Sequence, residues 1–176
     1  MESVLVCFVS IALIIVSTVT MTMNTVNSAA RLSGTWKDMQ QKANSVRRTE
    51  IVSLPPGDYS GGTIDLTVKN EGQENISNFA HWDIIIAGPD GNARYLTYSA
   101  SYPPGDSQWA VEGIYMSDGV PEVFDLNILN PAEFVQAGLN PNGVIGEGQT
   151  IKVIVATAEG VTSQCFVTEQ ANEPPP

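Results

Sequence analysis

The sequence predicts an α+β protein in which one long apolar N-terminal α-helix is followed by an antiparallel β-sandwich of the immunoglobulin-like kind. Three observations support this fold class. Residues 4–23 contain no charged residue, glycine or proline. Apolar residues at helical spacing continue to about residue 50, and beyond Pro55 apolar residues alternate with polar ones. We therefore divide the 176 residues into a helix, 1–50, and a β domain, 51–176, which is long enough to bury its own core.

The apolar segment VLVCFVSIALIIVSTVTMTM is long enough to cross a bilayer, because twenty helical residues span about 30 Å. It is apolar around its whole circumference, so we expect it to be buried on all sides, in lipid or in protein. We expect Glu2 to offset a neighbouring N-terminal amine in that dry environment. The side chains expected to form a buried helical core are Val4, Leu5, Phe8, Ile11, Ile14, Ile15 and Val19.

The flanks of this segment leave alternatives open. Every Lys and Arg follows the segment, whereas an anchor with a cytoplasmic N-terminus usually has basic residues before it. Either the β domain is cytoplasmic or a short basic leader has been removed from ahead of Met1, and we expect leader removal. A secretory signal peptide cleaved after Ala30 is one alternative, although the apolar run is long for a signal peptide. A membrane anchor with a helical stalk is another.

A stripe of small and apolar residues continues the helix beyond the apolar segment. Its spacings of three and four residues form the seven-residue repeat of a helix packed along another surface. Charged residues such as Lys37, Asp38 and Lys42 lie off the stripe. The pattern predicts one helix of about fifty residues, roughly 75 Å long, with its second half buried along one side. The residues of this helix seam are Ala29, Leu32, Trp36, Met39, Ala43 and Val46.

Short alternating segments separated by Gly, Pro and Asn predict the strands of the sandwich. The last two strands are expected to form a hairpin around Ala158-Glu159-Gly160. Residues 130–141, which have Asn-Pro at both ends, are expected to be a long loop with a helical turn at 132–137. The tail at 173–176 has no core-forming residues. The predicted strands are residues 63–69, 81–87, 94–99, 109–116, 124–129, 151–155 and 161–167.

Charge is distributed unevenly along the chain and excludes one class of partner. The net charge is −11, yet residues 1–50 contain five basic and three acidic residues, while residues 51–176 contain three basic and sixteen acidic residues. A domain this acidic repels nucleic acid, so we exclude nucleic acid as a partner.

No catalytic, cofactor or metal site is predicted, and we expect the protein not to be an enzyme. The only histidine, His81, is expected to be structural, and acids such as Asp118 stand beside glycine, as turn-forming residues do. Cys7 and Cys165 are expected to be unpaired and buried. Asn75-Ile76-Ser77 is an N-glycosylation sequon, so Asn75 is a candidate glycan site if the domain is exported.

The layout as a whole resembles that of archaellins, the type IV pilin-like subunits of the archaeal motility filament. The local similarities are VLVCFVSIALIIVSTVTMTMNTVNSAARL at 4–32, TIDLTVKNEG at 63–72 and IKVIVATAEGVTSQCFVTE at 151–169. Bacterial type IV pilins typically have Glu at the fifth mature position, where this sequence has Leu5, which favours the archaellin branch.

The resemblance implies a helical homopolymer at the cell surface whose subunits are stored in the membrane before assembly. It also implies a prepilin-type peptidase and an assembly ATPase with its membrane platform as partners. Archaellum accessory (stator) proteins share the helix-plus-sandwich design, so a membrane-anchored stator protein is one alternative. An adhesive pilus subunit that binds a surface-layer partner is another, and a secreted binding domain is a third.

Overall fold

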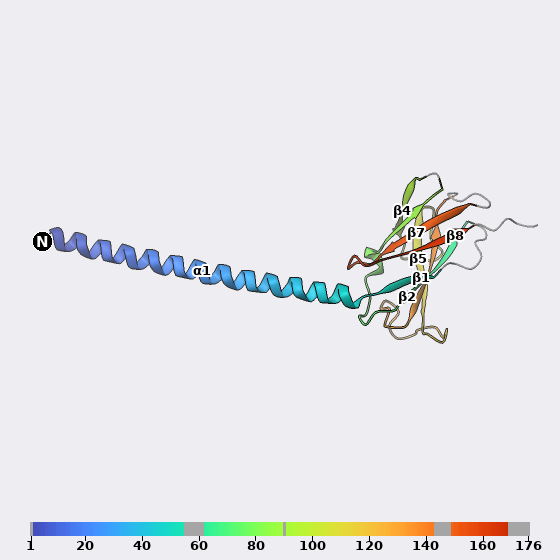
Figure 1. The fold of residues 1–176 in the computed structure, drawn as a ribbon, viewed down its shortest axis with the longest axis horizontal. Helices are drawn as coiled ribbons and strands as arrows, with labels where there is room; N and C mark the ends of the chain where they lie inside the picture. Colours follow the sequence, from blue (N-terminus) through green and yellow to red (C-terminus); the bar gives the residue numbers. More distant parts are fainter. Residues whose placement is uncertain (1, 55–61, 90, 143–148, 169–176) are drawn as a thin grey trace, which may run out of the picture. The chain divides into compact units, whose positions relative to one another are not determined.

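The computed structural model describes residues 2–54, 62–89, 91–142 and 149–168. The side chains of Glu2 and Val4, the tail at 173–176 and the Pro55-Pro56-Gly57 segment lie outside the described part. The chain forms two compact units, Met1–Asn44 and Ser45–Pro176. Figure 1 shows the long helix α1 and the β domain that follows it.

Helix α1 comprises Glu2–Arg48, 47 residues, which confirms the single long helix predicted from the sequence. At 1.5 Å per residue it is about 70 Å long. It contains no proline and one glycine, Gly34, so nothing in its interior interrupts the hydrogen-bond ladder. Arg47 and Arg48 occupy the last turn, where cations interact favourably with the helix dipole.

The β domain contains eight strands and one short 3₁₀ helix. The strands form one continuous hydrogen-bonded order, β1-β2-β6-β5-β4-β3-β7-β8. The 3₁₀ helix, η1, spans Phe79–His81. The strands are β1 (Ile51–Leu54), β2 (Ile64–Asn70), β3 (Asp83–Ala87), β4 (Ala93–Tyr98), β5 (Gln108–Tyr115), β6 (Phe134–Asn140), β7 (Thr150–Ala156) and β8 (Thr162–Thr168).

This order folds into the two layers of a sandwich, as predicted. One layer is β1-β2-β6-β5 and the other is β4-β3-β7-β8, and pairing within each layer is antiparallel. The layers are joined by a short parallel pairing of β4 with β5, in which Thr97 and Tyr98 lie opposite Gln108 and Trp109. The predicted antiparallel sandwich is therefore confirmed, with this one pairing as its parallel exception. At the other end the Ser53 amide of β1 donates to Ser163 Oγ of β8 at 2.8 Å, which nearly closes the sandwich.

The core lies between the layers and is formed by alternate residues of the strands. The pattern is clearest in β2, where Ile64, Leu66 and Val68 are buried while Asp65 is exposed. The predicted C-terminal hairpin is β7–β8, and its turn is closed by the Thr157 amide donating to the Val161 carbonyl at 2.9 Å. Each fully buried large apolar side chain contributes roughly 1.5–3 kcal/mol, so the domain has a core of its own.

Three sequence predictions are wrong. Residues 124–129 form turns rather than a strand; only Leu129 makes an isolated bridge, to Ile76, and the Phe124 side chain is 89% exposed. Residues 134–140, expected to be a loop with a helical turn, form β6, which pairs with β2 and β5 on its two sides. His81 lies in η1, and the strand expected to begin there begins at Asp83. The four-residue strand β1 is not among the predicted strands.

Candidate functional site

The candidate functional site is the surface of α1, because this helix is apolar and yet uncovered. Among the described residues α1 is the one helix that is long and apolar enough to cross a membrane, and no part of its apolar window is buried within the chain. Phe8 is 71% exposed and Leu5 is 69% exposed. A surface of this kind must be covered by lipid or by protein.

The predicted core residues cover about half of the helix circumference. At 100° per residue, Leu5, Phe8, Ile11, Ile14, Ile15 and Val19 lie on one half of α1, and each is about half exposed or more. The opposite half of the helix is also apolar, but the predicted set of core residues leaves its members out. The absence of any polar face in the sequence could have identified them. The omitted residues are Val6, Val9, Leu13 and Val16, which are 53–65% exposed.

The polar side chains within this apolar surface are satisfied by the helix itself. Ser and Thr hydroxyls donate to the carbonyl four residues earlier, for example Thr18 Oγ1 to the Ile14 carbonyl at 2.8 Å. Because these hydroxyls already have an acceptor, they can enter a water-free environment without losing a hydrogen bond. The same bond, at 2.8–2.9 Å, is made by Ser10, Thr20, Thr22 and Thr25.

One side of the apolar segment of α1 has a shallow depression that is lined largely by small side chains. Small residues allow the backbones of two helices to approach closely, which is the main source of helix association where water is absent. The residues that line this side are Ser17, Thr18, Met21, Thr22, Thr25 and Val26.

The residues of the predicted helix seam share one face of α1, within an arc of about 100°. Leu32, Trp36 and Met39 are 60–62% exposed, so the seam is uncovered through most of its length. Val46, in contrast, is half-buried and belongs to the compact unit of the β domain. Helix packing along the seam remains a prediction.

A second feature, missed from the sequence, is the junction that ties the last turn of α1 to the sheet. We define the junction as residues 45–50 together with residues 70–74. The Gln73 amide donates to the Arg48 carbonyl at 2.7 Å, and the Glu71 amide donates to the Glu50 carbonyl at 2.9 Å. Arg48 also forms a 3.0 Å ion pair with Glu74. The Arg48 carbonyl, left free at the helix end, thus gains a donor from the loop after β2.

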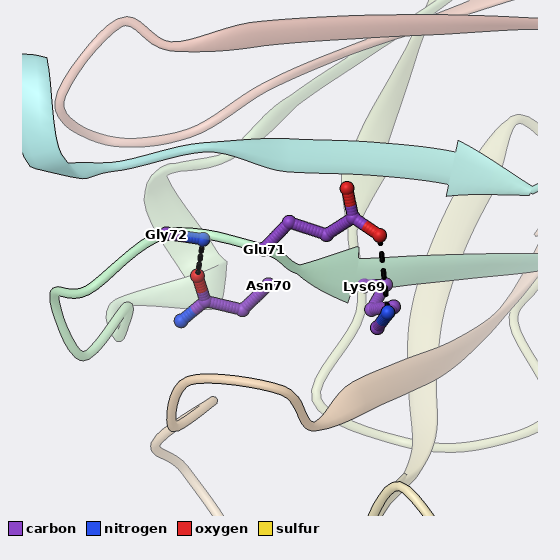
Figure 2. Close-up of polar contacts among 4 residues, drawn as sticks. All are labelled: Lys69, Asn70, Glu71 and Gly72. Atoms are coloured by element: carbon purple, nitrogen blue, oxygen red, sulfur yellow. Dashed lines mark hydrogen bonds and ion pairs between the residues drawn. The ribbon is translucent and has the colours of Figure 1, made fainter.

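Asn70 organises the loop side of the junction. Its side chain is fully buried, and Nδ2 donates to the carbonyls of Glu74 at 2.8 Å and Leu129 at 2.9 Å. Its Oδ1 accepts from the Gly72 amide at 3.0 Å, as Figure 2 shows beside the Lys69–Glu71 ion pair. A Cβ atom at Gly72 would lie 2.5 Å from the Arg48 carbonyl oxygen, so only glycine permits this approach.

Three sequence candidates remain, and they belong to different parts of the chain: Asn75, Cys165 and Cys7. Asn75 is exposed in the loop that follows the junction, and its role as a glycan site remains a prediction. Cys165 is buried in the sandwich, where burial raises the pKa of its thiol to about 11, while Cys7 is exposed on the isolated helix. Within the described residues no three His, Cys, Asp or Glu side chains gather as metal ligands would.

Comparison with known proteins finds likeness in structure but not in sequence. No family model matches the chain, and no curated protein matches it. The archaeal flagellum of Methanospirillum hungatei strain JF1 matches with a TM-score of 0.63 and 14% identity, over 95% of this chain and 93% of that one. The archaellum periplasmic stator protein FlaG of Sulfolobus acidocaldarius matches with a TM-score of 0.51 and 19% identity, over 67% and 98%.

The archaeal flagellin FlaB1 of Methanocaldococcus jannaschii matches with a TM-score of 0.51 and 13% identity, over 72% of this chain and 94% of that one. At these identities the comparisons establish fold. Helix α1 contains 47 of the 176 residues, so a match over 95% of the chain must include most of it. The chain therefore has an archaellin-like fold, an apolar N-terminal helix followed by a β-sandwich.

Proposed function

We propose that this chain is the structural subunit of a cell-surface, type IV pilin-like filament of the archaellum (motility) type, which polymerises through α1. The observation that supports this most strongly is the apolar, uncovered circumference of the first half of α1. The finished filament lies outside the cell, and the subunit is embedded in the membrane before assembly.

The energetics of α1 favour an assembled or membrane-embedded state over a soluble one. Nine large apolar side chains between Leu5 and Val16 are half exposed or more. Covering each one stabilises the covered state by roughly 1.5–3 kcal/mol, so release of this segment into water costs on the order of 15–25 kcal/mol. A filament whose core consists of copies of this helix would therefore not shed subunits into solvent.

Entry into such a filament needs help from other proteins. Lipid is as apolar as the helix surface, so transfer from bilayer to polymer core gains little hydrophobic free energy. What remains is close packing along the side lined by small residues, where the hydroxyls are already bonded within the helix. The archaellin resemblance implies an assembly ATPase with its membrane platform as partners and a prepilin-type peptidase as the processing enzyme, and this near balance fits a need for driven assembly.

The β domain is proposed to form the outer surface of the filament. Its sixteen acidic residues against three basic ones keep a densely displayed domain soluble. Asn75 is exposed there and is the proposed glycan site. The proposed role of the chain is structural and not catalytic, because an apolar helix offers a surface for packing.

A stator-type accessory protein is the second candidate, because FlaG of Sulfolobus acidocaldarius, described as an archaellum periplasmic stator protein, matches 67% of this chain. In that role the helix would be a single-pass anchor, and the β domain would bind a surface-layer partner. An adhesive pilus is a third candidate. The filament proposal is favoured because the match to the Methanospirillum hungatei flagellum includes the helix.

The deciding experiment is electron microscopy of material sheared from cells, with mass spectrometry of its main protein. The proposal expects filaments whose main band is this chain with residues 4–23 retained. A chain that stays in the membrane fraction at low copy number would favour the stator role. A mature chain that lacks the apolar segment would overturn both.

Glu2 provides a test of the polymer core. We propose that its carboxylate offsets a neighbouring N-terminal amine, because an unpaired charge in a dry core is strongly unfavourable. The Glu2→Gln variant is then expected to give fewer or less stable filaments, measured as sheared yield and as dissociation on heating. Normal yield and stability in this variant would contradict the role of Glu2.

A further inference from the structure

The loop between β5 and β6, residues 116–128, displays an apolar tip to solvent. Phe124 is 89% exposed and Val123 is 65% exposed, and Leu126 and Val120 are 60% and 49% exposed. Single exposed apolar residues are common on protein surfaces, but four large apolar side chains within seven residues form a cluster that needs an explanation. We call residues 116–128 the apolar loop.

Hydrogen bonds within the apolar loop and at its base fix its backbone conformation. The Glu122 carboxylate accepts from the amides of Val123 at 2.9 Å and Phe124 at 2.7 Å. At its base the Met116 amide donates to the Val120 carbonyl, and the Glu122 amide donates to the Ile114 carbonyl, both at 2.8 Å. The loop is therefore ordered before any partner arrives, which lowers the entropic cost of binding.

The apolar loop itself is acidic. Asp118, Glu122 and Asp125 lie in the loop, and the chain has no Lys or Arg between Arg94 and Lys152. The side chain of Asp125 makes no hydrogen bond or ion pair among the described residues. A partner that covers this surface should be apolar at its centre and basic at its edges.

One part of this same chain has that chemistry, the segment 31–42 of α1. Leu32, Trp36 and Met39 expose apolar side chains there. Arg31, Lys37 and Lys42 surround them, with Asp38 as the one acid of the segment. Among the described residues of Met1–Asn44 these three bases form no ion pair, since the two ion pairs that the described residues form, Arg48–Glu74 and Lys69–Glu71, both belong to the other unit.

We propose that the apolar loop of one copy docks on residues 31–42 of α1 in a second copy. The contact joins two different surfaces, so after one contact each subunit still has its other surface free for a further copy. A contact of this kind extends into a filament when it does not close into a ring. The proposal rests on the proposed filament function and specifies how neighbouring subunits recognise one another outside the apolar core. Binding of the loop to its own helix is the competing arrangement.

Photo-crosslinking in assembled filaments tests the contact directly. Benzoylphenylalanine is introduced at Phe124, and filaments are grown from a mixture of ¹⁵N-labelled and unlabelled subunits. The expected result is crosslinked peptides that join residue 124 to segment 31–42, with mixed light and heavy partners. Crosslinks made only within one copy, or only to other segments, would overturn the docking proposal while the filament function stands. Absence of filaments from wild-type protein as well would overturn both.

Reciprocal charge reversal supplies an independent test. Asp125→Lys and Lys37→Glu are each expected to raise the subunit concentration needed for growth about threefold to tenfold, because each replaces an attraction with a repulsion. The double variant is expected to recover most of this loss. Asp106→Lys makes the same charge change on an exposed turn outside the loop and is the matched control. A double variant no better than either single one, with all variants folded by tryptophan fluorescence, would overturn the proposal.

Discussion

Replacing Asn70 with alanine is the perturbation that tests the junction most directly. The change removes three hydrogen bonds of a buried side chain, two donated by Nδ2 to the carbonyls of Glu74 and Leu129 and one accepted from the Gly72 amide. Each such bond contributes about 0.5–1.5 kcal/mol, so the expected loss in the free energy of unfolding is about 2–4 kcal/mol. For a domain of this size that loss corresponds to a Tm lower by roughly 10 °C.

The assay is thermal unfolding of the detergent-solubilised full chain, followed by near-ultraviolet circular dichroism. Trp82 and Trp109 are both buried in the β domain and report its packing, whereas Trp36 is exposed on α1. The matched control is Asn127→Ala, because Asn127 is exposed and makes no side-chain hydrogen bond among the described residues, so its change should stay within about 0.5 kcal/mol. If the Asn70 variant melts at the wild-type temperature, Asn70 does not hold the junction together.

Three further predictions concern single positions. Gly72→Ala should cost about 1–3 kcal/mol in the same melting assay, since the added methyl group meets the backbone at Arg48; an unchanged Tm would contradict this. The hydrogen bond that the Phe124 amide donates to the Glu122 carboxylate holds the pKa of Glu122 below its usual value. The loop should therefore be ordered at neutral pH and lose order as pH falls through that lowered pKa. Amide NMR shifts of Phe124 measure this transition, and Glu122→Gln should abolish it. Burial raises the pKa of Cys165 from 9.0 to about 11, so its thiolate population is roughly a hundredfold smaller and alkylation at pH 8 should be slow until urea unfolds the domain.

The helix could be predicted from the sequence because its determinants are local. A stretch without proline and with Gly34 alone needs no distant partner to be helical, and the predicted end at about residue 50 differs by two residues from the observed end at Arg48. Six strands could also be predicted, since alternation along β2 or β7 follows directly from one face being buried.

Two of the errors among the strands, at residues 124–129 and 134–140, share a cause, which is that alternation does not reveal whether a partner strand exists. Phe124 and Leu126 alternate with polar residues, but the Glu122 carboxylate accepts a hydrogen bond from the Phe124 amide, and the segment forms a turn instead of a strand. Val135, Ala137 and Leu139 alternate as well, yet their segment lies between Asn-Pro pairs that indicate loops. It becomes a central strand because β2 and β5 both pair with it.

The junction could not be predicted, because its contacts join parts of the chain that are distant in sequence. Asn70 and Leu129, for example, are 59 residues apart. The available signal was weak: a polar residue at the inward position that ends the alternating strand β2, followed closely by a glycine. The apolar surface of α1 required no such information, since composition alone indicated it.

Salt should separate the two contacts proposed for the filament. The core contact involves a segment, 4–23, without charged residues, whereas the loop–helix contact depends on groups such as Asp125 and Lys37. Raising the ionic strength from 0.15 M to 1 M shortens the Debye length from about 8 Å to about 3 Å, which screens exposed charges and leaves apolar burial in place. Existing filaments should therefore survive 1 M salt, while the growth defect of Asp125→Lys should shrink toward the wild-type value, as measured by light scattering of growing filaments. A defect that stays the same size at 1 M salt would mean that the substitution acts on the shape of the loop rather than on attraction between copies.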